Sequence, residues 1–169
     1  DGDPETQISL RYTRDGFGNI TSTLAEDAFG KWRSSCTSYE AQGMFPYAHR
    51  NAAGHLSFTR YDPARGLLRS VVDPNGLATR WGYDRFGRTT RELGPDGVAT
   101  TYTLTRTKDG GPYQDEWNLK MQAVTPGWRD DTVQYDSLGR AVRWWQQGVQ
   151  VGAQPAPRVM QRETFDALG

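Results

Sequence analysis

Between residues 56 and 104, short apolar segments alternate with clusters of turn-forming residues. Two such segments are "LLRSVV" (67–72) and "LATRWGY" (77–83), which are rich in β-branched and aromatic residues. Segments of this length and composition, bounded by turns, are typical of β-strands. The alternation in Thr79-Arg80-Trp81 indicates strands with two different faces. The pattern predicts an all-β fold: stacked antiparallel hairpins in one twisted, curved sheet, with little helix.

The predicted turns recur at a nearly constant spacing. They begin at Asp62, Asp73, Asp84 and Gly94, roughly every 11 residues, and Asp-x-x-Gly occurs six times in the chain. Asp at the first turn position can bond its own backbone two residues on, and the glycine takes a positive φ. Type I turns followed by such a glycine commonly connect hairpins. We therefore expect these pairs to set the turns: Asp15 and Gly18, Asp62 and Gly66, Asp73 and Gly76, Asp84 and Gly87, Asp136 and Gly139.

Two turns together give a longer period of about 21 residues, as from Gly66 to Gly87 and from Gly76 to Gly97. Repeats of this kind bury their surfaces by stacking on their neighbours. We predict one repeat region over residues 1–169. The repeats are clearest at 56–104, 132–147 and 158–169, and irregular inserts are expected at 25–55 and 107–131.

The motif Tyr-Asp-x-x-Gly-Arg, at 83–88 and again at 135–140, resembles the YD repeat of RHS proteins. Phe165-Asp166-Ala167-Leu168-Gly169 resembles a further copy. The amino-acid sequence of residues 73–97 is most similar to the RHS-type wall of the insecticidal Tc toxin B component and of SpvB-related toxins.

This resemblance implies a spiralling sheet that closes into a hollow shell around a toxic polypeptide. The expected partners are the rest of the shell and the enclosed toxin, and the expected location is outside the bacterium or on its surface, as part of a larger protein. One aromatic residue of each repeat is expected to pack between neighbouring hairpins: Tyr12, Tyr61, Tyr83, Tyr135 and Phe165.

The charges balance, with 20 basic and 20 acidic residues. A neutral chain lacks the basic footprint of a protein that binds nucleic acid or an anionic membrane. No apolar run reaches the length of a membrane span. The cut ends of a wall segment would expose unpaired strand edges, so we expect edge-to-edge self-association of the isolated piece.

Catalytic and metal sites have weak support in the sequence. Cys36, His49 and His55 form a poor metal set without the spacing of a known motif. Asp62 and Asp73 superficially resemble the start of the self-cleaving RHS core, but the chain continues into a plain repeat at Tyr83. We expect no catalytic residue, no metal and no cofactor.

A second function stays open: an extracellular carbohydrate-binding or adhesion module. The chain has six Trp, and 17 of its 20 basic residues are Arg, which can stack on aromatic rings. Aromatic platforms with Arg nearby can stack on sugar rings. The candidate platforms are Trp117, Trp128, Trp144 and Trp145.

Overall fold

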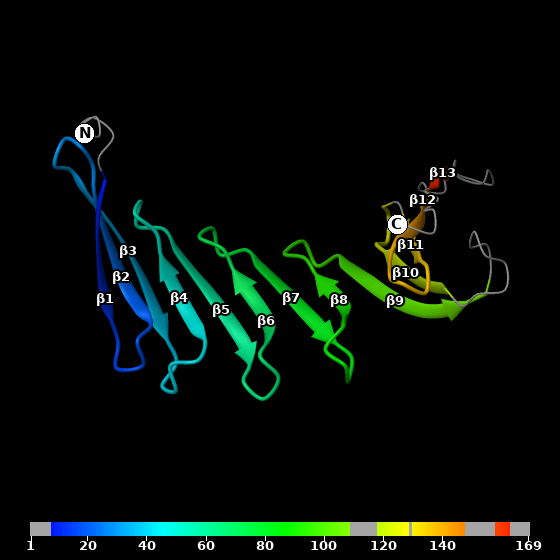
Figure 1. Ribbon diagram of the computed structural model, residues 1–169, viewed down its shortest axis with the longest axis horizontal. Coiled ribbons are helices and arrows are strands. Elements are labelled where there is room, and N and C mark those ends of the chain that lie inside the picture. Colours follow the sequence, from blue (N-terminus) through cyan, green and yellow to red (C-terminus); the bar gives the residue numbers. More distant parts are fainter. Residues whose placement is uncertain (1–7, 109–117, 129, 148–157, 163–169) are drawn as a thin grey trace. The chain divides into compact units, whose positions relative to one another are not determined.

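The computed structural model describes residues 8–108, 118–128, 130–147 and 158–162 (Figure 1). Over these residues the chain forms thirteen strands and no helix, and each strand lies beside the next one in the sequence. The predicted all-β fold of antiparallel hairpins is confirmed. The strands are β1 (Ser9–Arg14), β2 (Ile20–Glu26), β3 (Trp32–Tyr39), β4 (Pro46–Arg50), β5 (Leu56–Asp62), β6 (Leu67–Val72), β7 (Ala78–Tyr83), β8 (Thr89–Leu93), β9 (Ala99–Thr107), β10 (Asn118–Val124), β11 (Asp130–Tyr135), β12 (Ala141–Gln147) and β13 (Arg158–Arg162).

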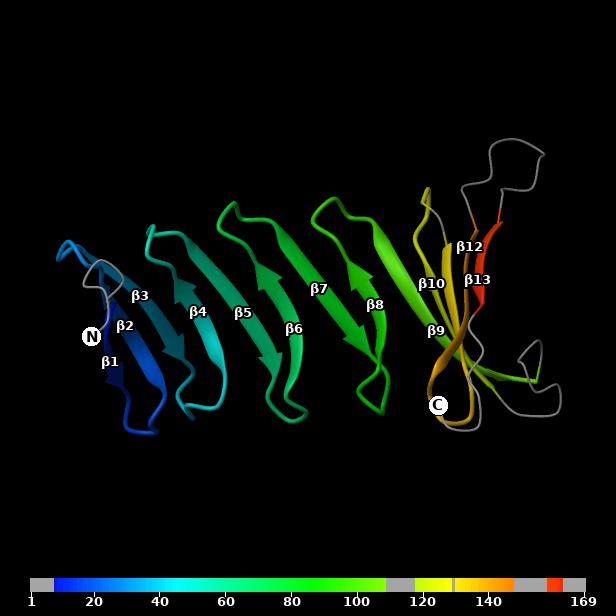
Figure 2. The same ribbon diagram turned by 45° about the horizontal axis from the view of Figure 1, so that its top comes forward.

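The chain divides into two compact units, Asp1–Arg80 and Trp81–Gly169, with the boundary inside β7. In the first unit, the strands from β1 onward lie side by side as successive hairpins (Figure 2). In the second unit, the strands from β8 onward continue the same up-and-down order.

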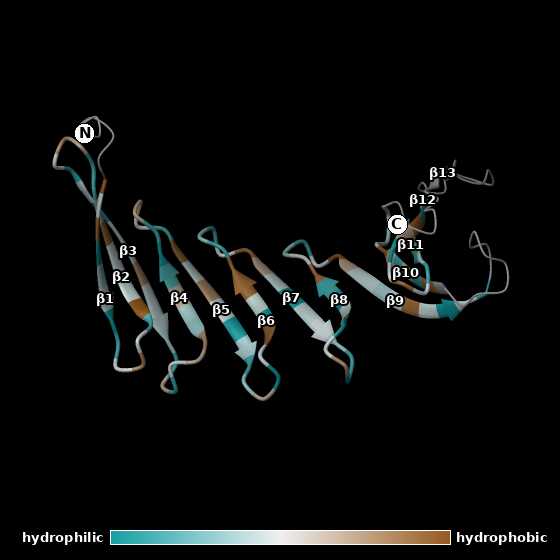
Figure 3. Ribbon diagram, viewed as in Figure 1, coloured by the Kyte–Doolittle hydropathy of each residue, from teal (hydrophilic) through white to brown (hydrophobic). Residues whose placement is uncertain are grey.

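Strand register places the side chains on two faces. In the first unit Phe58 lies opposite both Ala48 and Val72, so these three share a face. Thr59 lies opposite Val71 and belongs to the other face. Apolar and polar residues therefore mix along single strands, while the turns between them are mainly hydrophilic (Figure 3).

The sheet is a single layer within each unit. Within each unit, the contacts between described strands join only neighbours in the sheet, so no described element of the same unit packs over either face. Val142 is the only fully buried apolar side chain among the described residues, whereas large apolar side chains such as Phe58 and Leu104 remain exposed. Large apolar side chains therefore remain accessible on the sheet.

The turns lie alternately at the two ends of the strands, because every connection joins antiparallel neighbours. Each of these two rows of turns is called a turn edge, or simply an edge when turns are discussed, to distinguish it from the outer strands of the sheet. In the first unit the turns beginning at Asp15, Glu40 and Asp62 lie at one edge. Those beginning at Asp27, Asn51 and Asp73 lie at the opposite edge.

A β-bulge accompanies only some of these turns. The register shifts by one residue in β1–β2, β3–β4, β5–β6 and β11–β12, next to the turn in each case. The extra residues are Thr21, Tyr47, Arg69 and Val142. The pairs formed across the other edge of the first unit, such as β2–β3 and β6–β7, show no shift.

Two segments differ from the sequence-based expectation. Residues 25–55, expected to be an irregular insert, contain β3 and β4 joined by regular turns. Within 107–131, β10 and the first residues of β11 are also regular strands. The reason is chemical: Glu40 and Asn51 replace Asp at the turns, so the Asp-x-x-Gly pattern disappears while the hydrogen bonds persist.

Candidate functional site

The repeated turn is built by one carboxylate. At Asp84, Oδ1 accepts the backbone N–H groups of Phe86 (2.8 Å) and Arg88 (3.0 Å). The backbone of Asp84 also accepts the N–H of Gly87, whose φ is +84°. Arg88 Nε donates to Oδ2 of the same carboxylate at 2.7 Å. The Asp, the Gly and the Arg of the local motif thus each have a hydrogen-bond partner inside one turn.

Asp136 repeats this arrangement in a more buried setting. Its Oδ1 accepts the N–H groups of Leu138 and Arg140, both at 2.9 Å, and Arg140 Nε donates to Oδ2 at 2.8 Å. Asp136 itself is only 3% exposed. A buried carboxylate with every oxygen paired is a structural centre of the turn rather than an open ligand site.

These hydrogen bonds set the acidity of the turn carboxylates. Burial works to raise the pKa of Asp84 and Asp136, but the arginine and the backbone N–H groups outweigh it, so each pKa lies below its usual range. Burial and the Asn19 side chain act in the same opposed way on Asp15, whose pKa is also lowered. At Asp62 the hydrogen bond from Arg69 is the largest cause of a lowered pKa.

Sequence reasoning missed three members of this set. Asn51 Oδ1 accepts two backbone N–H groups as Asp does, and Glu40 Oε1 accepts those of Met44 and Phe45. A further turn runs from Thr125 to Trp128. A search for any side-chain acceptor three residues before a glycine would have found the turns at Asn51 and Glu40.

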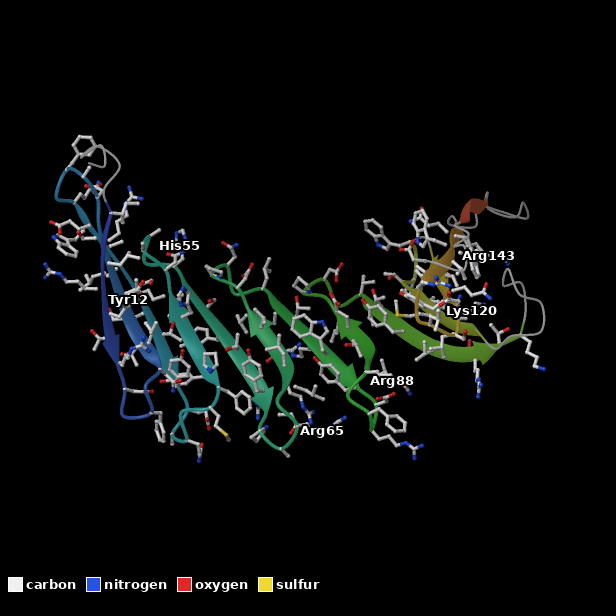
Figure 4. The ribbon with its side chains drawn as sticks, in the orientation of Figure 1. Tyr12, His55, Arg65, Arg88, Lys120 and Arg143 are labelled. Atoms are coloured by element: carbon white, nitrogen blue, oxygen red, sulfur yellow. The ribbon has the colours of Figure 1, made fainter. Side chains whose placement is uncertain are left out.

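The tyrosines before the turns follow a simple rule. Tyr39, Tyr61, Tyr83 and Tyr135 each precede a turn, and all four are partly buried. In the first unit Tyr39 and Tyr61 precede turns at the same edge. Tyr12, labelled in Figure 4, is further from its turn and half exposed. Phe165 and Asp166 lie outside the described residues.

One tyrosine of the first unit contacts the preceding hairpin. The Tyr61 ring stacks on Phe45 with centroids 5.0 Å apart and planes 18° apart. Together with Glu40 and Tyr47 they line a hollow of about 200 Å³. Neighbouring turns at this edge also touch, since Asn19 Nδ2 donates to the carbonyl of Gly43 at 2.6 Å. Side chains therefore tie successive hairpins together at this edge.

A hollow of about 440 Å³ in the second unit is mainly aromatic and apolar, with one carboxylate among its lining residues. Trp81 comes from β7, Glu92 from β8 and Tyr102 from β9. Trp81 Nε1 and the Tyr102 hydroxyl both donate to Glu92 Oε2, at 3.1 and 3.3 Å. Leu104 and Met121 complete the wall. Burial, and then the charge of Glu92, raise the pKa of Tyr102, so this phenol stays protonated at neutral pH.

A second hollow in this unit, about 270 Å³, has mainly polar lining residues. Lys120 on β10, Asp130 on β11 and Arg143 on β12 line this hollow together with Trp145. Lys120 and Arg143 are labelled in Figure 4. Lys120 Nζ lies 5.6 Å from the centre of that ring, in reach of a cation–π contact.

The other candidate platforms are scattered. Trp144 is adjacent to Trp145 on β12, so the two rings point to opposite faces. Trp128 lies on the β10–β11 turn and is 68% exposed. Trp117 lies outside the described residues. Trp144 and Trp145 therefore do not form one platform, and of the described candidates Trp145 lines a described hollow.

The histidines and the cysteine have separate partners. His49 Nδ1 lies 3.1 Å from Thr37 Oγ1, and His55 Nδ1 lies 3.5 Å from Asn51 Nδ2. Cys36 pairs in register with Arg50, the neighbour of His49, so Cys36 and His49 lie on opposite faces. Within the described ranges no three His, Cys, Asp or Glu side chains are grouped as metal ligands would be.

Asp62 and Asp73 do not form a catalytic pair in this arrangement. They begin turns at opposite ends of β6, and each accepts backbone N–H groups of its own turn. No helix in the described part of the chain is long and apolar enough to cross a membrane.

Comparison with known families identifies one segment. Residues 61–99 match the family model of the RHS Repeat. The match runs from the end of β5 to the first residue of β9 and contains the turns at Asp62, Asp73 and Asp84. No curated protein matches the chain. The match covers residues 61–99 alone, so it identifies an RHS repeat in this segment of the chain.

Proposed function

We propose that the protein is a structural, non-enzymatic segment of an RHS/YD-repeat shell, which encapsulates a toxin or effector polypeptide in a secreted bacterial toxin. The RHS repeat is a structural repeat family, which agrees with a wall rather than an enzyme. The amino-acid sequence of residues 73–97 is similar to the wall of Tc toxin B components and SpvB-related toxins, and this similarity supports the more specific assignment.

The observation that carries the proposal is the single-layer sheet. Globular domains bury one sheet face against a second layer. Here the described strands contact only their sheet neighbours, and large apolar side chains stay exposed. Extended apolar surface of this kind marks contact with another polypeptide. A wall supplies that contact on its inner face and by stacking of further repeats along the sheet.

The proposal is tested on the complete natural polypeptide that contains this segment. Under limited proteolysis, the enclosed toxin or effector polypeptide should resist cleavage, whereas the same polypeptide expressed without the shell should be degraded. Mild denaturant that opens the sheet should abolish the protection. Equal cleavage of the toxin or effector polypeptide with and without the shell would refute encapsulation. A natural polypeptide with no further repeats to close a shell would refute it as well.

A second candidate function is carbohydrate binding, and the polar hollow around Trp145 favours it. An aromatic ring beside amide and charged side chains, here Gln122, Gln147 and Asp130, is a suitable surface for a sugar ring. Lys120 and Arg143 would favour an acidic sugar.

A glycan array distinguishes this candidate from the wall. Trp145→Ala should abolish binding, and Trp144→Ala provides the matched control because its ring lies on the opposite face. Glycan binding that survives Trp145→Ala, or no binding at all, would remove this candidate.

A further inference from the structure

We propose that the hollow of the second unit between Trp81 and Tyr102 binds the cationic side chain of a polypeptide, an arginine or a lysine, through the carboxylate of Glu92. The inference rests on the proposed function in one respect: the polypeptide would be the enclosed one. The site itself is defined by side chains from β7, β8 and β9.

The hydrogen bonds leave one acceptor available. Glu92 Oε2 accepts both Trp81 Nε1 and the Tyr102 hydroxyl. Within the described residues no hydrogen bond reaches Oε1 of Glu92, so this oxygen is available to an incoming donor. Because the indole and the phenol direct their donors to Glu92, neither is available to an anion. The hollow therefore favours a cation.

The nearby arginine does not cancel this charge. Arg88 also lines the hollow, but its guanidinium is paired with Asp84, with Nη2 at 2.7 Å from Oδ2. The same guanidinium lies 5.1 Å from the Phe86 ring centre. Its charge is thus balanced within its own turn, and the net charge facing the hollow is that of Glu92.

The walls fit a long side chain that carries its charge at the tip. Leu104 and Met121 are 38% and 37% exposed, so they offer apolar surface for the methylene groups of arginine or lysine. The faces of Trp81 and Tyr102 can attract a cation as well. Carboxylate, aromatic rings and apolar wall together recognise a cationic side chain better than a sugar, which needs several donors and acceptors.

The test uses the whole chain and the peptide acetyl-Gly-Arg-Gly-amide. The Trp81 indole N–H signal, assigned with Trp81→Phe, is followed by NMR during titration. We expect a saturable shift with the arginine peptide. With the neutral citrulline peptide, which has nearly the same shape, we expect about tenfold weaker binding, as loss of one charge-assisted hydrogen bond implies.

The variant Glu92→Gln gives an independent check. Its side-chain oxygen can still accept the two donors, so the fold should persist, while the arginine peptide should bind about tenfold more weakly. The matched control is Glu26→Gln on β2, in the other unit, which should bind the peptide as the unchanged chain does. Equal affinity for the two peptides, undiminished binding to Glu92→Gln, or no saturable shift would each overturn the inference.

The two proposals fail in different ways. Loss of proteolytic protection in the natural polypeptide would refute encapsulation without affecting peptide binding. Protection with equal binding of arginine and citrulline peptides would leave the wall in place and refute the cationic subsite.

Discussion

Replacing Gly16 and Gly18 separately by alanine compares two positions of one turn that differ in backbone conformation. Gly18 has a φ of +89°, whereas the φ of Gly16 lies outside the left-handed region. A Cβ added at either residue would meet nothing within 4 Å. Neither substitution therefore creates a steric clash, and the two variants differ in the backbone conformation that the alanine must adopt.

The magnitude follows from two terms. Alanine reduces the conformational entropy of the unfolded chain at both positions, which stabilises each variant by about 0.4–1 kcal/mol. At Gly18 the left-handed conformation costs an alanine about 1–2 kcal/mol in the native state. The first term is shared, so Gly18→Ala should be less stable than Gly16→Ala by about 1–2 kcal/mol.

Urea unfolding of the full chain, followed by far-UV circular dichroism, measures this difference. For m-values typical of small proteins, the two midpoints should differ by about 0.5–1 M. Gly18→Asn should recover part of the loss, because asparagine tolerates the left-handed region better than alanine. Coincident midpoints for Gly16→Ala and Gly18→Ala would refute the assignment of Gly18 as the residue that requires a positive φ.

Three further predictions concern the turns and the edges. Asp136→Ala leaves two backbone N–H groups without their acceptor and should lower the free energy of unfolding by about 2–4 kcal/mol; Asp136→Asn keeps an acceptor oxygen, so calorimetry should find it the more stable of the two. Because the folded-state pKa values of four turn aspartates are lowered, their stabilisation is present above the unfolded value of about 3.9 and is lost as the pH falls through the folded values. Thermal melts between about pH 5 and pH 2 should show a falling Tm, and a constant Tm would contradict the role of these residues: Asp15, Asp62, Asp84 and Asp136. Among the described strands β1 pairs only with β2 and β13 only with β12, so each has one unpaired side. The chain should therefore self-associate through these two outer strands. A strictly monomeric mass in sedimentation at high concentration would exclude this self-association.

The sequence was sufficient for the turns because their interactions are local. The hydrogen bonds described above for the Asp84 turn run between residues no more than four positions apart. Asp-x-x-Gly therefore carries most of the geometry in its own letters. The Asp-x-x-Gly pattern missed the turns at Glu40 and Asn51, because there a glutamate or an asparagine supplies the acceptor oxygen in place of aspartate.

The cluster of Trp81, Glu92 and Tyr102 could not be predicted in the same way. Its members come from three strands, so their meeting depends on the register of each strand against the next. A bulge of one residue changes register and moves side chains to the other face. Nothing in the letters of β8 marks where β9 will pair with it, and an isolated glutamate gives no motif.

The period of 21 residues has a physical reason in the placement of the bulges. A bulge bends its strand and increases the local twist. In the first unit the bulges accompany the turns at one edge, those beginning at Asp15, Glu40 and Asp62, whereas the pairs across the other edge are regular. Two strands are therefore needed before the same distortion recurs.

A distortion confined to one edge adds in the same sense at every repeat. A strip of such hairpins should curve steadily in one direction, as a wall that closes around a polypeptide requires. The extra residue also has a local use: Arg69 is the bulge residue of β6 and reaches Asp62 at 3.0 Å, and Val142 is the bulge residue of β12 and is fully buried. In these hairpins the register shift falls at the tyrosine that precedes the turn, namely Tyr39, Tyr61 and Tyr135, so the bulge and the tyrosine mark the same turns.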